Sequence, residues 1–165
     1  MIVLQAGRTK FTHRVAAVAV RDGHVLLSQC DGDGFWYLPG GRIDLLETAS
    51  EALVREMREE MGVEVRVERL LWVIENYFGF DGFRNHELGL YFLTRLPDSL
   101  GPLISPMFDG REGHRRIIFR WFDLGSLEGE QVYPTFLKSA LRNPPAWTEH
   151  IVHRDGTVAG SDGVA

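Results

Sequence analysis

The sequence predicts an α/β fold in a single domain, and three observations lead to this prediction. The chain has 165 residues, enough for one ordinary globular domain with a substantial core and too few for a second. Several runs of β-branched and aromatic residues are separated by turn residues, which is typical of strands. One further segment carries the start and stop signals of an amphipathic helix.

The first third of the chain is predicted to be β structure. Residues 12–20 are rich in small and β-branched side chains, and a turn sequence separates them from a second apolar run at 25–27, which predicts a hairpin. A short aromatic strand is predicted at 35–38, where a proline ends it. Gly40 and Gly41 follow. Because they lack a Cβ, the backbone there can bend sharply or approach another group closely.

A helix is predicted from Thr48 to Met61. Thr48 and Glu51 fit a capping box, in which the Thr hydroxyl accepts from a first-turn amide and the Glu carboxylate accepts from the Thr amide. Gly62 stands where a left-handed residue would end the helix. On a wheel of about 100° per residue, one stripe of the helix is apolar and predicts burial against a sheet. This stripe consists of Leu53, Val54, Met57 and Met61.

The second half of the chain is predicted to add a hairpin, a loop, a strand and a short helix. Residues 63–74 and 88–93 alternate in polarity across a turn and read as antiparallel partners. Residues 97–114 contain several prolines and glycines without a period, which predicts an irregular substrate-binding loop. A strand is predicted at 116–122 and a short helix at 134–141. We therefore expect one domain over residues 1–155 and a flexible C-terminal tail at 156–165.

Composition limits the classes of partner. The formal net charge is −5, and no run of Lys and Arg offers a footprint for nucleic acid, so an anionic substrate would need a bridging cation. The single cysteine, Cys30, excludes an internal disulfide framework and suits a reducing cytoplasm. No apolar stretch approaches the roughly 20 residues that span a bilayer, and no signal peptide is evident. We expect a cytoplasmic protein that contacts neither nucleic acid nor membrane.

Three glutamates of the predicted helix share one arc. With Glu56 at zero, Glu60 falls at about +40° and Glu59 at about −60°. Like charges at these spacings repel by a few tenths of a kcal/mol each, and a divalent cation reverses the sign of that interaction. Because Mg²⁺ and Mn²⁺ prefer oxygen ligands, the arc predicts a site for one of these ions.

The context of this arc carries a family resemblance. From Gly41 there are five intervening residues, Glu47, seven more residues, and then Arg55 through Val63, which reads REMREEMGV. This pattern resembles the Nudix box and matches it at every specified position. The preceding Trp36-Tyr37-Leu38-Pro39-Gly40 also resembles the usual approach to that box, and the resemblance is plausible across residues 12–141. It implies the Nudix fold, a mixed β-sheet sandwiched between helices.

The resemblance also implies roles for individual residues. The positions of Glu56, Glu59 and Glu60 generally bind Mg²⁺ or Mn²⁺, assisted by a carbonyl from the glycine pair, here Gly40 or Gly41. Such an ion neutralises the pyrophosphate and activates water for in-line attack at phosphorus. The general base varies within the superfamily, and we favour Glu59 over Glu56. Arg55 and Glu47 resemble the ion pair that orients the loop and the helix.

Residues outside the box remain open. Candidates for further ligands or bases are Glu87, Asp109 and Glu112, although the favoured interpretation of each is a surface acid. Arg14 and Arg84 are candidates for phosphate pairing, and the resemblance leaves the substrate-binding residues unknown. Aromatic residues that would stack a nucleobase or fill the core are Tyr77, Phe78, Phe80, Phe83, Trp36 and Phe108.

The functional hypothesis is metal-dependent hydrolysis of a phosphoanhydride bond in a nucleoside diphosphate-linked small molecule. Nucleoside triphosphates, dinucleoside polyphosphates and nucleotide sugars all fit the box. The alternative is a catalytically silent sensor or scaffold that binds a nucleotide derivative, although such domains typically lose box glutamates that this chain retains. An enzyme acting on capped RNA would want a basic groove, which the acidic balance disfavours. Homodimers are common among similar proteins.

Overall fold

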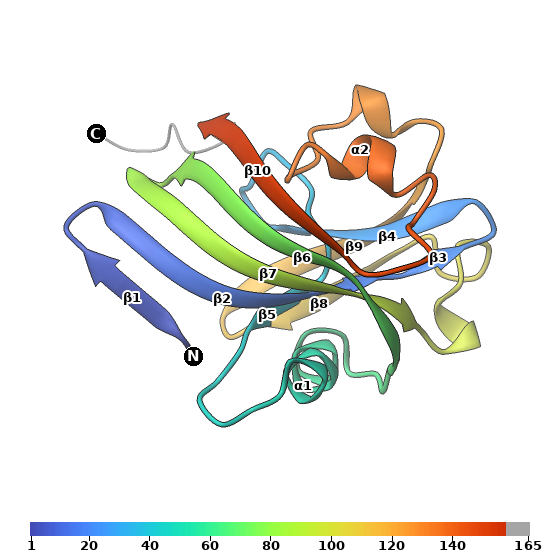
Figure 1. Ribbon diagram of the computed structural model, residues 1–165. Helices are drawn as coiled ribbons and strands as arrows, with labels where there is room; N and C mark the ends of the chain where they lie inside the picture. Colours follow the sequence, from blue (N-terminus) through green and yellow to red (C-terminus); the bar gives the residue numbers. More distant parts are fainter. Residues whose placement is uncertain (158–165) are drawn as a thin grey trace.

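The computed structural model describes residues 1–157, which form two β-sheets, two α-helices and two short 3₁₀ helices (Figure 1). The helices are α1 (Ala49–Met61), α2 (Leu137–Ala140), η1 (Asp98–Leu100) and η2 (Leu127–Gly129). The strands are β1 (Val3–Ala6), β2 (Thr9–Val18), β3 (Val20–Arg21), β4 (His24–Cys30), β5 (Gly40–Arg42), β6 (Arg66–Phe80), β7 (Phe83–Arg95), β8 (Met107–Glu112), β9 (Arg115–Asp123) and β10 (Glu149–Thr157).

The larger sheet is mixed, as predicted. Its order is β1-β2-β7-β6-β10, with β5 pairing β2 beside this path. Strands β2 and β7 are parallel, as are β6 and β10, while the other pairs are antiparallel. The smaller sheet has the order β3-β4-β9-β8 and is antiparallel throughout. The single sheet of the prediction is therefore divided in two.

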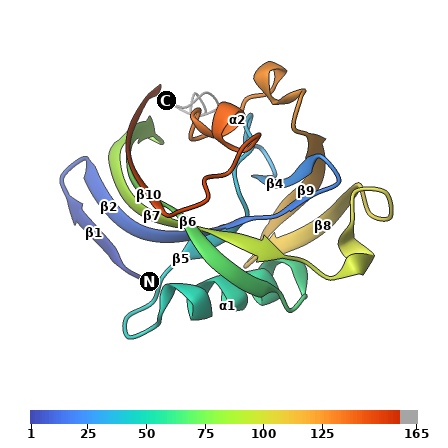
Figure 2. The same ribbon diagram turned by 45° about the vertical axis from the view of Figure 1, so that its right-hand side comes forward.

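Alternation along β2 creates two helix-covered faces. Val15 and Ala17 pack in a core cluster with Leu53 and Met57 of α1, so α1 covers one face of the larger sheet. The intervening residues, Ala16 and Val18, belong to another cluster that includes Leu137 of α2. Because successive strand side chains point to opposite faces, one strand serves both cores. Figure 2 shows the two helices on opposite sides of the strands, which confirms the predicted α/β/α arrangement.

The predicted hairpins are confirmed with corrections to their extents. The hairpin at 12–27 is limited to its tip, where Val20 pairs with Val25, because the chain leaves the larger sheet at Ala19 and continues in the smaller one. Most of β2 instead pairs in parallel with β7. The second hairpin is longer than predicted, since β6 and β7 extend to Phe80 and Phe83 on either side of the turn at 81–82.

Two local predictions were wrong. Residues 35–38 form isolated bridges at Trp36 and Tyr37 instead of a strand, because each contacts a different partner segment. Residues 97–114 are not an irregular loop throughout, since 107–112 form β8 and pair with β9. The glycines and prolines concealed this strand, and Gly110 is required there because a Cβ would lie 2.1 Å from the carbonyl oxygen of Glu60. Strand β8 thus lies against the end of α1.

The C-terminal part of the described chain contains a strand that the sequence did not predict. Strand β10 pairs in parallel with β6 and runs to Thr157, so it includes the first two residues of the predicted tail. The remaining predicted tail, 158–165, lies outside the described residues. Within residues 1–157, no helix is both long and apolar enough to cross a membrane.

Candidate active site

Helix α1 begins and ends as its sequence requires. Thr48 accepts a hydrogen bond from the Glu51 backbone N–H at 3.3 Å, and the Glu51 carboxylate accepts from the Thr48 N–H at 2.9 Å. At the other end, Gly62 adopts the left-handed conformation with φ of 69°. Leu53 and Met57 are fully buried on the apolar stripe. These features fix which face of α1 turns toward the sheets.

Arg55 connects the helix to the loop before it. Its Nε and Nη2 donate to the two carboxylate oxygens of Glu47 at 2.8 and 3.0 Å, a bidentate geometry, and Nη2 also donates to the Arg42 carbonyl at 3.1 Å. Its Nη1 donates to Glu56 at 2.8 Å and to Glu59 at 3.3 Å. The Arg55 guanidinium therefore connects the loop at Glu47, strand β5 at Arg42, and the helix residues Glu56 and Glu59.

The glycine pair packs where any side chain would intrude. A Cβ on Gly41 would lie 2.1 to 2.4 Å from the carboxyl atoms of Glu56, so this carboxyl can sit against the backbone only because residue 41 is glycine. Gly40 has φ of 140°, and its carbonyl accepts a hydrogen bond from Arg14 Nη2 at 3.0 Å. The Glu56 side chain is only 13% exposed, and burial raises its pKa against the opposing effect of Arg55.

Glu60 is the most strongly perturbed of the three box glutamates. It is 7% exposed at the end of α1. Burial raises its pKa to about 8; the Arg14 charge opposes this shift, while Glu56, Glu112 and Glu59 reinforce it. A carboxyl in such a place is neutral near pH 7 unless a cation joins it, because burial disfavours the charged form.

The donor set fits a hard divalent cation. Glu56, Glu59, Glu60 and the Gly40 carbonyl offer oxygen alone, which Mg²⁺ and Mn²⁺ prefer, and a bound ion would offset the mutual repulsion of these carboxylates. Among residues 1–157, however, no three acidic, His or Cys side chains are gathered at the spacing of a formed ion site. Arg55 Nη1 bonds both Glu56 and Glu59, and the Glu59 side chain is 60% exposed.

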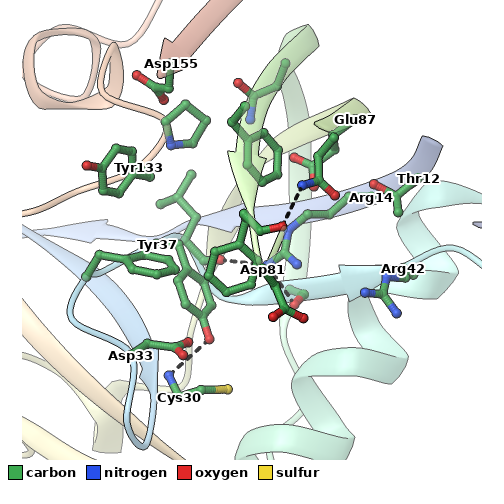
Figure 3. A pocket seen from close by; sticks show the side chains of 18 of the residues that line it. Thr12, Arg14, Cys30, Asp33, Tyr37, Arg42, Asp81, Glu87, Tyr133 and Asp155 are labelled. Atoms are coloured by element: carbon green, nitrogen blue, oxygen red, sulfur yellow. Dashed lines mark hydrogen bonds between the residues drawn. The ribbon is translucent and has the colours of Figure 1, made fainter. Parts of the chain in front are cut away.

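A cavity of about 390 Å³ opens beside Glu60. Figure 3 shows Glu87, Arg14 and Thr12 on one wall, with Cys30, Asp33 and Tyr37 on the facing wall. Arg14 is half-buried; it donates to the carbonyls of Leu38 and Gly40, and its charge acts on both Glu60 and Glu87. The cavity thus runs from the α1 carboxylates to the middle of the larger sheet.

The structure divides the residues that the sequence left open. Glu87 and Glu112 line the cavity, whereas Asp109 is exposed and forms an ion pair with Arg116 at 2.8 Å. Arg14 lines the cavity and Arg84 does not. The candidate aromatic residues divide in the same way: Phe78, Phe80 and Phe83 line the cavity, Trp36 packs with Phe122, Phe108 stacks on Phe119, and Tyr77 stacks on His86.

Several lining residues were missed by sequence reasoning. They alternate along three neighbouring strands, which puts them on one face of the sheet. This period of two was the available signal, but it points to a cavity only once the strand order is known. The missed residues on these strands are Lys10 and Thr12 of β2, Asn76 of β6, and Asn85 and Tyr91 of β7.

The fold and the site together define a class of protein. It is an α/β/α sandwich in which one carboxyl of a glutamate-rich helix, that of Glu60, lines a cavity that also has aromatic side chains in its wall. Comparison with known families identifies the class further, because the NUDIX domain family matches residues 11–140. The chain therefore belongs to the NUDIX family.

Individual relatives share parts of this chain. It is 44% identical over 62 residues to the CTP pyrophosphohydrolase of Escherichia coli (strain K12), covering 35% of this chain and 46% of that protein. It is 42% identical over 45 residues to the 8-oxo-dGTP diphosphatase of Proteus vulgaris, covering 27% of this chain and 40% of that one. In both cases the match spans less than half of the relative's length.

A solved structure supports the fold assignment. The crystal structure of an ADP-ribose pyrophosphatase from Streptococcus suis superposes with a TM-score of 0.54 and 20% sequence identity, covering 86% of this chain and 98% of that one. At this identity the similarity establishes the Nudix fold alone.

Proposed function

We propose that this protein hydrolyses a phosphoanhydride bond in a nucleoside diphosphate-linked small molecule, with Mg²⁺ or Mn²⁺ as cofactor. The observation that carries the proposal is the buried carboxyl of Glu60, which opens onto the cavity among three other acidic side chains. Nothing in the fold requires so unfavourable a group, whereas a cation between it and a pyrophosphate would be stabilised there.

The residues around Glu60 divide the work in this proposal. Glu56, Glu59, Glu60 and the Gly40 carbonyl hold the cation, which supplies charge neutralisation to the pyrophosphate. Glu59 accepts the proton from the attacking water, since it is the most exposed of the box glutamates. Arg14 donates to phosphate oxygens from the cavity wall. Arg55 and Glu47 act as positioning residues for the carboxylates.

The substrate class is inferred from the cavity and from the relatives. Phe78, Phe80 and Phe83 offer apolar faces at the end of the cavity remote from α1, which suits a planar base. The relatives with the stated matches are named for hydrolysis of CTP and of 8-oxo-dGTP. A nucleotide or nucleotide derivative accounts for both observations.

We also propose the setting in which the protein works. A single domain, a buried free Cys30 and a net charge of −5 suit a cytoplasmic enzyme acting on small molecules, without nucleic acid or membrane as partners. A homodimer is part of this proposal, and light scattering of the purified protein would test it.

The test is release of phosphate and pyrophosphate from nucleoside triphosphates, dinucleoside polyphosphates and nucleotide sugars, measured with Mg²⁺, with Mn²⁺ and with EDTA. Turnover of one class that EDTA abolishes is the expected result. Binding of nucleotides without turnover of any of them would favour the silent sensor. A control variant is Asp109→Asn. It removes an acidic side chain of the β8–β9 hairpin that lies outside the cavity.

A further inference from the structure

A row of polar side chains crosses the larger sheet where it lines the cavity. Thr12 of β2 pairs with Glu87 of β7, and Glu87 pairs with Asn76 of β6, so the three side chains are lateral neighbours. All three line the cavity. On the same sheet face, Lys10 and Arg14 flank Thr12, Asn85 and Gly89 flank Glu87, and Ile74 and Phe78 flank Asn76. The row therefore joins the polar side chains of β2 to the apolar side chains of β6.

Asn76 is the least accessible member of this row. It is 4% exposed, and its side-chain amide forms a hydrogen bond with the Glu87 carboxyl. Its Oδ1 finds no hydrogen-bond partner among residues 1–157. Buried amide oxygens in folded proteins are nearly always paired, so this orphan, on a residue that lines the cavity, indicates that a bound molecule supplies the missing N–H.

Glu87 is suited to act beside Asn76 as both donor and acceptor. Burial raises its pKa, although the Arg14 charge, the bond from Asn76 and the Arg42 charge oppose the change. A neutral carboxyl donates through its O–H and accepts through its other oxygen. Its side chain is only partly buried and remains open to the cavity. With the Glu87 carboxyl protonated, Asn76 and Glu87 would present an acceptor next to a donor.

The walls above this row are aromatic. Phe35 and Phe80 meet edge to face with ring centroids 5.7 Å apart, and Phe35 meets Tyr133 in the same way at 5.5 Å. Phe78 and Phe83 complete the lining. Such faces stack planar rings, while the strand row below is left to recognise the ring's edge.

We propose that Asn76 and Glu87 read the hydrogen-bonding edge of the substrate's nucleobase. An N–H of the base would donate to Asn76 Oδ1, and the Glu87 carboxyl would donate to the acceptor beside that N–H. This edge occurs as an amino group next to a ring nitrogen in cytosine and adenine, and as a ring N–H next to a carbonyl in uracil and guanine. The inference rests on the proposed function, which puts the pyrophosphate at the Glu60 end.

The test measures binding rather than turnover. CMP, AMP, UMP, GMP and ribose 5-phosphate are titrated calorimetrically into the full chain in Mg²⁺ buffer. At least one nucleotide is expected to bind about tenfold or more tightly than ribose 5-phosphate. Comparing CMP and AMP with UMP and GMP shows which of the two kinds of edge is preferred. Equal affinity for all five ligands, or no detectable binding by any of them, would overturn the inference.

Variants then assign the discrimination to these residues. Asn76→Leu keeps the volume without polar atoms and is expected to remove the preference while leaving ribose 5-phosphate affinity unchanged. Glu87→Gln, which still donates and accepts, retains the preference, and Glu87→Leu loses it. Thr94→Val is the control, because Thr94 is buried on the same strand but bonds only to the Phe92 carbonyl and lies outside the cavity. An unchanged preference in Asn76→Leu sinks the assignment.

If Asn76→Leu does not fold, the same contact can be removed from the ligand instead of the protein. An analogue of the preferred nucleotide whose edge N–H is removed or methylated is expected to lose the same preference with the unaltered protein. An analogue that binds as well as its parent contradicts the inference. Base-selective binding without hydrolysis would overturn the proposed function alone, whereas hydrolysis without base selectivity would overturn this inference alone.

Discussion

The two halves of helix α1 differ in how their charges are compensated. In the first half, Thr48 and Glu51 exchange hydrogen bonds, and Arg55 closes a bidentate pair with Glu47. In the second half, Glu60 is buried near Glu56 and Glu59, with its pKa raised to about 8. The same helix therefore contains a region built for folding and a region that folding alone does not explain.

This difference separates two roles for charged residues on one helix. Paired groups hold the segment in place, and their partners are present in the chain. Glu56 and Glu59 are paired with Arg55, whereas the best partner for Glu60 is a cation from outside the chain. A helix that keeps such a group must be anchored elsewhere, and Leu53 and Met57 in the core provide this anchor. Four substitutions test this contrast.

Glu60→Gln has the largest expected effect. Turnover is expected to fall by at least about 100-fold, the upper range for loss of groups that merely support a metal site. Without metal the variant is expected to be more stable, because a neutral amide avoids the burial of an ionised carboxylate, a cost on the order of 4 kcal/mol from the raised pKa.

The stability gain has a defined pH dependence. The folded-state pKa of Glu60, about 8, lies above its ordinary value of 4.5, so the folded protein loses stability as pH rises between these values. In EDTA, the melting temperature of Glu60→Gln should therefore equal that of the natural protein near pH 4.5. Above pH 8 it should exceed that of the natural protein by the full amount. If Glu60→Gln were less stable than the natural protein at pH 9, the claim that the second half of α1 contains a destabilising carboxyl would be wrong.

Arg55→Lys tests the junction between the halves. Lysine keeps the charge but lacks the planar fork that meets both Glu47 oxygens, so kcat/KM is expected to fall by about 10- to 100-fold. Arg58→Lys is the matched control, because Arg58 lies on the same helix and its side chain bonds the exposed Glu64, which lies beyond the helix end. Equal losses in the two variants would show that the Arg55 geometry contributes nothing specific.

Thr48→Ala isolates the folding half. Removing the cap is expected to lower the free energy of unfolding by about 1 kcal/mol, since the Glu51 N–H loses its acceptor. Turnover per folded molecule should not change, because the cap lies at the opposite end of α1 from Glu60. Urea titration and steady-state kinetics on the same sample would check both, and a large loss of kcat would contradict the division.

Glu112→Gln has the smallest expected effect. The Glu112 charge helps to raise the pKa of Glu60, so its removal should move the acidic limb of the pH–rate profile to lower pH, by less than about one unit. Asp109→Asn, on the same strand but paired outward with Arg116, should leave the profile in place. Identical profiles for the two variants would show that Glu112 is not coupled to the site.

Local features were predictable from the sequence. The capping box, the Gly62 terminus and the apolar stripe depend on neighbours within a few residues, and α1 forms as predicted. The Nudix box put Glu56, Glu60 and the glycine pair together, and the structure places the Gly41 backbone against Glu56. Spacing within one helix and the loop before it was sufficient.

Long-range features were not predictable in the same way. Strand β10 forms because β6 offers an edge far away in the sequence, and its residues are mostly exposed and polar, without a clear strand pattern. The row of Thr12, Glu87 and Asn76 exists only because β7 lies between β2 and β6. Glu87 was a candidate from its charge, but Asn76 could not be recognised without the strand order.

Arg14 makes the two ends of the cavity thermodynamically dependent on each other. Its guanidinium charge acts on both Glu60 and Glu87, so a cation bound at Glu60 would repel the guanidinium and favour its interaction with Glu87. By linkage, whatever factor a bound cation applies to nucleotide affinity, the nucleotide must apply to cation affinity. Cofactor and substrate would then be cooperative ligands, even though neither needs to touch the residues that recognise the other.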